Sequence, residues 1–130
     1  MQWSRNEAST LPMRPLPKAG YTQAVEIRNA SRTLYISGQI PVDVQCKIPK
    51  AFSDQARLVW RNMEVPLRAA DMSLDNLMKV TTFLSDRWFS DENRAVRKGI
   101  LGDRAPALTV IITGIFDSAW LLEIEAIAAA

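Results

Sequence analysis

Residues 33–41 read Thr-Leu-Tyr-Ile-Ser-Gly-Gln-Ile-Pro, and this stretch predicts a well-defined strand. Its first five residues are rich in β-branched and aromatic side chains, which favour extended structure. The strand should end at Gly38 to Pro41, because glycine permits a close backbone approach or a positive φ and proline cannot donate to a ladder. Residues 21–28 alternate in polarity and predict a partner strand, joined to the first by a turn at residues 29–32.

A helix is expected after a loop over residues 41–51. It should begin near Ser53 or Asp54, because either side chain can accept a hydrogen bond from the first turn. Apolar residues then recur at spacings of three and four, which indicates one buried helix face. They are Phe52, Ala56, Val59, Met63, Leu67 and Ala70. Asp71 follows, a residue type that tolerates the left-handed conformation of a helix exit.

The second half of the chain alternates between strand and helix patterns. A second helix is expected over residues 86–98, with Gly99 and Gly102 as stop signals. Strands are predicted at residues 77–84, 108–113 and 121–128. The order ββαβαββ indicates an α+β fold with helices on one face of a mixed sheet. We divide the chain into an extended, proline-rich N-terminal arm, residues 1–17, and a single domain, residues 18–130.

The sheet face without helices carries a mixed set of side chains. In the last strand Glu123, Glu125 and Ile127 point to one side, because side chains alternate along a strand. Residues 107–113 carry no charge and are mostly apolar on both sides. The second face should therefore be buried too, and a chain of 130 residues has no further layer to cover it. Self-association is the simplest solution; the alternative is an exposed face that merely tolerates apolar residues.

Composition restricts the chemistry. The chain has no histidine and one cysteine, Cys46, which excludes Ser-His-Asp and Cys-His catalysis, zinc sites built from His and Cys, and internal disulfides. Sixteen Lys and Arg against fourteen Asp and Glu leave a net charge of +2, too mild to indicate a nucleic acid or a membrane as partner. No cofactor and no metal is predicted. Without a secretory signal or a long apolar run, the expected location is the cytoplasm.

Three segments together resemble the RidA/YjgF family of small trimeric proteins, also described as endoribonuclease L-PSP-like. Residues 34–41 resemble the family's strand ending in S-G-Q-I-P. Gln55-Ala56-Arg57 with Asn62 resembles its Q-A-R…N helix, and residues 123–128 (EIEAIA) resemble its closing strand. The resemblance covers roughly residues 18–128. It implies a chorismate-mutase-like homotrimer whose sheets face inward, with three small-molecule clefts between neighbouring subunits.

The resemblance also implies an activity and a set of site residues. Active members hydrolyse reactive imines or enamines, releasing ammonia and a 2-keto acid. Glu123 matches the glutamate that positions the attacking water. Tyr21 matches a pocket tyrosine, Ser37 and Gly38 match a serine–glycine turn, and Asn93 occupies the place of an asparagine in the second helix. Such a site needs no histidine, because an imine carbon is electrophilic enough for a positioned water to attack it.

One position departs from the family's pattern. Active deaminases read P-A-R ahead of the penultimate strand, whereas this chain reads Pro106-Ala107-Leu108. The missing arginine would hold the substrate carboxylate through charge-assisted hydrogen bonds, each worth about 1.5–3 kcal/mol. Its loss should weaken a small carboxylate substrate by about tenfold to several hundredfold. Arg104 could replace it only by reaching across about 10 Å of strand.

Several interpretations therefore remain open. The chain could be an imine or enamine deaminase whose substrate is not held as a simple carboxylate, a non-catalytic trimer that binds a more apolar metabolite, or an interaction scaffold. Glu123 could instead bond the backbone of a neighbouring subunit, and Tyr21 could pack at a trimer seam. Arg94, Arg97 and Lys98 are interpreted as a solvated face of the second helix.

Overall fold

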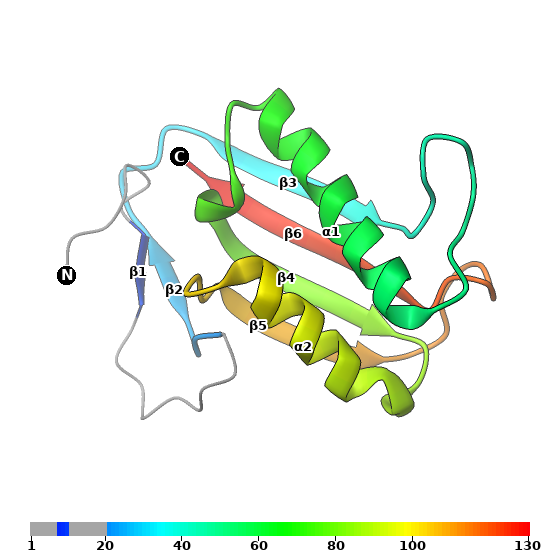
Figure 1. The fold of residues 1–130 in the computed structure, drawn as a ribbon. Coiled ribbons are helices and arrows are strands. Elements are labelled where there is room, and N and C mark those ends of the chain that lie inside the picture. Colours follow the sequence, from blue (N-terminus) through cyan, green and yellow to red (C-terminus); the bar gives the residue numbers. More distant parts are fainter. Residues whose placement is uncertain (1–7, 11–20) are drawn as a thin grey trace.

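The structure, a computed structural model, describes residues 8–10 and 21–130 and has two helices packed across one face of a four-stranded sheet (Figure 1). This is the α+β architecture that the sequence predicts. The elements in chain order are β1 (Ala8–Thr10), β2 (Val25–Ile27), β3 (Thr33–Gln39), α1 (Phe52–Ala69), β4 (Leu77–Leu84), α2 (Ser90–Leu101), β5 (Ala107–Ile112) and β6 (Leu122–Ala129), with short 3₁₀ turns at Leu74–Asn76 and Arg87–Phe89.

The sheet is mixed and has the strand order β3-β6-β4-β5. β6 pairs antiparallel with β3 and with β4, whereas β5 pairs parallel with β4. The predicted strand over residues 21–28 is shorter than expected, because only Val25–Ile27 forms β2. Its predicted pairing with the strand that begins at Thr33 is wrong: β2 pairs with β1 in a separate two-stranded sheet, and β3 pairs with β6. Within the predicted N-terminal arm, residues 1–7 and 11–17 lie outside the described residues, so the boundary at residue 18 stays a prediction.

The hydrophobic core lies between the helices and the sheet. α1 contributes a row of fully buried side chains that includes Trp60, Met63 and Leu67, as its three-and-four spacing predicts. In β6, every second residue from Leu122 to Ala128 is buried against the helices. Since the side chains of a strand alternate, the remaining residues of β6 face away from the core. No helix in the described part of the chain is long and apolar enough to cross a membrane.

The helix starts differ from those predicted by capping rules. α1 begins at Phe52 with no side-chain cap, so the expected caps Ser53 and Asp54 are wrong. Phe52 is buried and stacks on Phe89 with ring centroids 4.6 Å apart, and this packing outweighs the missing cap. α2 begins at Ser90, because Asp86 caps the preceding 3₁₀ turn through the N–H of Trp88 instead.

The helix ends are closer to the prediction. Asp71 adopts the expected positive φ, at 57°. Gly99 lies inside α2 rather than at its end. Gly102 alone acts as the stop signal, at the C-cap with a φ of 61°.

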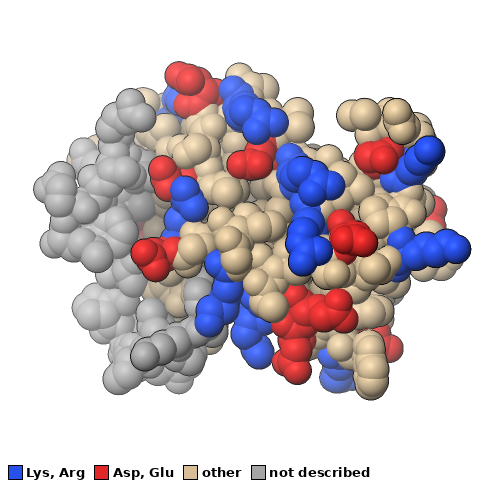
Figure 2. All heavy atoms as spheres, in the orientation of Figure 1, with Lys and Arg blue, Asp and Glu red and all other residues tan. Residues whose placement is uncertain are grey.

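The face of the sheet opposite the helices is open over most of its area in the described part of the chain; at one end Val25 of β2 and Ala30 pack against the buried Met78 and Ala129. Tyr35 of β3 is 76% exposed there, and Ile111 of the edge strand β5 is 40% exposed. The helix-covered side, by contrast, shows basic and acidic side chains scattered together over its outer surface (Figure 2).

Candidate functional site

Glu123 and Gly38 lie against each other on the uncovered face. Glu123 projects there because its neighbours Leu122 and Ile124 point into the core. Opposite β6, the pairing of β3 shifts register between Ile36 and Gln39. A Cβ atom built on Gly38 would lie 1.8 Å from Oε2 of Glu123. Glycine is therefore required here by close approach of the carboxylate and not by a positive φ, which among the described glycines only Gly102 adopts.

The Glu123 carboxylate is half-buried and turned toward the open side. Within residues 8–10 and 21–130 it makes no hydrogen bond or ion pair. Ser37, which precedes Gly38, is exposed on β3. Glu123 thus offers carboxylate oxygens that a water or a ligand could reach. No cluster of three or more His, Cys, Asp or Glu side chains that could hold a metal is found among the described residues.

A second group of candidate residues lies on the helix side of the sheet. Leu108 pairs with Val80 in the parallel β4–β5 ladder and packs, like Val80, against the core. Asn93 is buried in α2. Thr22 bridges to Ala107 and donates its N–H to the carbonyl of Pro106 at 3.2 Å, which places Tyr21 beside the start of β5.

The structure thus divides the predicted site residues between the two faces of one sheet. Glu123, Ser37 and Gly38 belong to the uncovered face, whereas Leu108 and Asn93 belong to the helix side. A backbone layer separates the two groups, so a small molecule cannot contact both within one chain.

Arg97 is a buried cation that our sequence interpretation missed. It is only 4% exposed, so assigning it to a solvated face was wrong. Asn93, Arg97 and Leu101 recur at a spacing of four and share the buried side of α2, and this spacing could have identified it. Burial lowers the pKa of Arg97, the neighbouring Arg94 lowers it further, and Tyr21 raises it. Tyr21 therefore lies close enough to Arg97 to interact electrostatically.

Arg104 is directed away from Leu108. Its Nε donates to Asp75 Oδ1 at 2.6 Å, and its Nη1 donates to the carbonyl of Leu101 at 3.2 Å. Asp75 lies in the 3₁₀ turn before β4. In this structure Arg104 therefore does not take the place of an arginine at position 108.

The amide side chains of the Q-A-R…N motif hold the loops next to Glu123 and Gly38. Gln55 donates to the carbonyls of Pro49 at 2.8 Å and Ala119 at 3.0 Å, and accepts from the N–H of Leu121 at 2.8 Å. Asn62 donates to the carbonyls at positions 40 and 42, at 2.9 and 3.1 Å. These amides fix the loop that leaves β3 and the loop that enters β6, so their role is structural.

The helix-covered mixed sheet and the glutamate–glycine contact on its open face define a small α+β protein of the RidA type. A family model described as Endoribonuclease L-PSP matches residues 12–130. The chain belongs to this family, which is the RidA/YjgF family that the three sequence segments resemble.

Individual relatives support the assignment. A RutC family protein of Pyrococcus horikoshii is 35% identical over 116 residues, covering 88% of this chain and 90% of the relative. Among solved structures, E. coli TdcF with bound serine is 32% identical with a TM-score of 0.72, covering 85% of this chain and 87% of that chain. A Rid family protein of Yersinia pestis has a TM-score of 0.82 at 21% identity, over 95% of this chain and 98% of that one, and this match concerns the fold alone.

Proposed function

We propose that this protein forms a homotrimer that hydrolyses a small imine or enamine in clefts between neighbouring subunits. The observation that carries the proposal is the Glu123 carboxylate, held over Gly38 on an uncovered sheet face with no partner among the described residues. The exposed Tyr35 and Ile111 on the same face support burial by a second subunit. TdcF, the relative with bound serine, supports a small amino-acid-like ligand.

Glu123 would act as the general base toward water. The oxygen of the water bonds to the imine carbon while the carboxylate accepts one of its protons. That proton passes to the nitrogen and gives a tetrahedral carbinolamine. The carboxylate then accepts the hydroxyl proton and delivers it to the amino nitrogen, the carbon–nitrogen bond breaks as the carbon–oxygen double bond forms, and ammonia leaves. The product is the corresponding carbonyl compound. An enamine enters the same route once its carbon is protonated to give the imine.

The neighbouring subunit would complete the cleft with Tyr21 and Leu108, which are half-buried in the single chain, while Asn93 is buried in α2 and would lie behind this wall. Leucine makes that wall apolar, and an apolar wall disfavours a buried carboxylate. We therefore expect a substrate that contacts position 108 through carbon atoms. The same leucine favours the second candidate function, a trimer that binds a more apolar metabolite without catalysis.

Ammonia release separates the two candidates. Wild-type protein is assayed against a panel of freshly generated imines, beside Glu123→Gln and a matched control, Glu125→Gln, which changes an acid two residues along the same strand face. If the protein is a deaminase, the wild-type protein and Glu125→Gln should release ammonia from at least one imine, and Glu123→Gln should not. If no imine gives activity above the Glu123→Gln background, the deaminase is rejected. A saturable thermal stabilisation by a metabolite, about 2.7 kcal/mol at 100 times its Kd, would then support the binding trimer.

Subunit mixing tests whether the cleft is shared. Glu123→Gln and Tyr21→Ala damage different groups of residues, so each alone should be inactive. The two variants are then refolded together in equal amounts. Each cleft takes Glu123 from one subunit and Tyr21 from its neighbour, and each of these is intact in half of the subunits. About a quarter of the clefts in random trimers therefore contain both intact residues. Activity should therefore return to about a quarter of the wild-type level. Mixed trimers that stay inactive, or a stable monomer at micromolar concentration in sedimentation, would contradict the shared cleft.

A further inference from the structure

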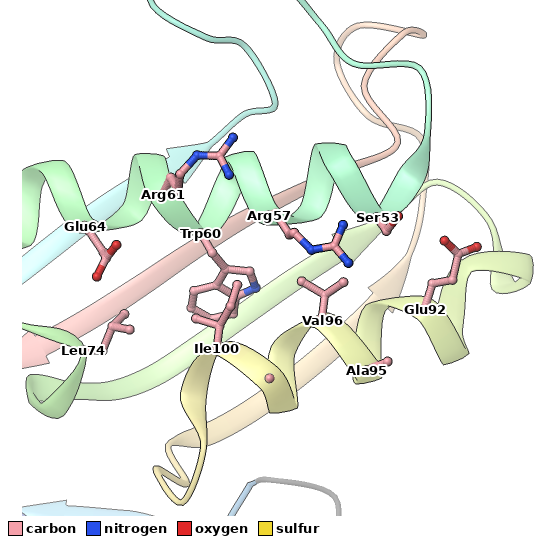
Figure 3. Close-up of a pocket in the computed structure, with 11 residues that line it drawn as sticks. Ser53, Arg57, Trp60, Arg61, Glu64, Leu74, Glu92, Ala95, Val96 and Ile100 are labelled. Carbon is pink, nitrogen blue, oxygen red and sulfur yellow. The ribbon is translucent and has the colours of Figure 1, made fainter.

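A groove between α1 and α2 lies on the outer surface of the helix layer, away from Glu123 and from Leu108. Its volume is about 840 Å³, within the range of about 300–1,000 Å³ that ligand pockets occupy. Figure 3 shows side chains of both helices converging on it. The lining residues are Ser53, Arg57, Trp60, Arg61, Glu64, Leu74, Glu92, Ala95, Val96, Gly99 and Ile100.

The floor of the groove contains an unsatisfied hydrogen-bond donor. Trp60 is only 2% exposed, and its Nε1 is buried with no hydrogen-bond partner in the described part of the chain. Buried donors are normally paired, so this nitrogen marks a place where an acceptor is missing. Figure 3 shows the nitrogen edge of the indole on the side of Arg57 and Val96.

Arg57 supplies a positive charge at the rim above this donor. Its side chain is 54% exposed and pairs with Asp54 at 3.4 Å, an exposed ion pair of the kind that contributes little. Arg57 can therefore exchange this ion pair at small cost for an anion bound in the groove. An oxygen anion placed there would accept from both groups, and hydrogen bonds from charged donors are the stronger kind.

The other residues that line the groove determine which kind of anion it can bind. Arg57 and Arg61 are balanced by Glu64 and Glu92, so the groove has no excess positive charge for a multiply charged phosphate. Leu74, Val96 and Ile100 line it with apolar surface. We propose that this groove binds a monocarboxylate with an apolar body, whose carboxylate accepts hydrogen bonds from Trp60 Nε1 and from Arg57.

Titration with octanoate, followed by the ¹H–¹⁵N resonance of the Trp60 indole, tests the proposal. Trp60→Phe assigns that resonance. Octanoate should shift it saturably, whereas 1-octanol and inorganic phosphate should not. Arg57→Gln should weaken octanoate binding about tenfold. Arg94→Gln is the matched control and should bind like wild type, because Arg94 has the same exposure and the same 3.4 Å ion pair but lies outside the groove.

A second variant blocks the groove without removing a donor. A Cβ added to Gly99 meets no atom within 4 Å, so Gly99→Leu fills empty space and should abolish the shift while the protein stays folded. An indole resonance that does not respond to millimolar octanoate would overturn the proposal. So would equal responses to octanol or phosphate, or unchanged octanoate binding in Gly99→Leu. Glu123→Gln should bind octanoate normally, which keeps this test independent of the proposed catalytic cleft.

Discussion

Replacing Gly38 by alanine should displace the Glu123 carboxylate and leave the fold intact. The new Cβ would lie 1.8 Å from Oε2, 2.7 Å from Cδ and 2.9 Å from Cγ of Glu123. Restoring ordinary van der Waals contact requires the carboxylate oxygen to move by about 1.5 Å. The obstructing atoms belong to the end of a flexible side chain, so a rotamer change can absorb the overlap at about 0.5–1.5 kcal/mol. Alanine also has fewer accessible conformations than glycine in the unfolded chain, and this difference stabilises the folded state by about 0.4–1 kcal/mol.

The effect on hydrolysis should be much larger than the effect on stability. A misplacement of about 1 Å can cost about a hundredfold in rate, so Gly38→Ala should lose at least that much imine hydrolysis while its urea midpoint hardly changes. Gly114→Ala is the control, because a Cβ at Gly114 meets no atom within 4 Å.

A double variant, Gly38→Ala with Glu123→Gln, sharpens the test. Both changes disable the same carboxylate, so the double variant should be no slower than Glu123→Gln alone. A wild-type rate for Gly38→Ala would refute the reasoning. Multiplicative losses in the double variant, or a loss of activity that merely follows unfolding, would refute it equally.

Three further substitutions test other parts of the structure. Gln55→Leu removes three hydrogen bonds and leaves loop groups unpaired, so urea unfolding should show a loss of about 2–4 kcal/mol; a loss below about 1 kcal/mol would argue against the loop-holding role. Leu108→Arg should raise ammonia release from 2-iminopropionate, and an inert variant that still forms the trimer would count against the cleft. Gly99→Ala should raise the free energy of unfolding by roughly 0.5–1 kcal/mol, because Gly99 lies inside α2 with open space at its Cβ; thermal unfolding at a lower temperature than wild type would contradict this.

The hydrophobic periodicity of single helices and strands predicted the fold, because the residues that it marks as apolar are the ones that the fold buries. The stripe of α1 and the alternation of β6 both match the observed core, since periodicity reports directly which side is buried. The start of α1 was missed because it depends on Phe52 stacking on Phe89, a contact between residues 37 positions apart. No local capping signal records such a contact.

The candidate site was only partly accessible from the sequence. The motif resemblance pointed to Glu123 and Gly38, and the structure adds the physical reason for glycine, the carboxylate resting on its backbone. The burial of Arg97 was missed because a run of charged residues was assigned to solvent as a whole. The division of the candidates between two sheet faces depends on strand register, which the sequence of a single strand does not determine.

Arg97 changes the meaning of the leucine at position 108. An arginine stays protonated in proteins, so burial places a lasting positive charge on the side of α2 that carries Asn93, close to Tyr21. The helix side of the sheet, which has leucine instead of arginine at position 108, therefore still contains a cation, Arg97 of α2. A substrate carboxylate bound there would interact with Arg97, and an arginine introduced at position 108 would repel it, because like charges disfavour each other. Arg97 already has an interaction within the described part of the chain. The gain in ammonia release from 2-iminopropionate that Leu108→Arg gives should therefore be limited by repulsion from Arg97.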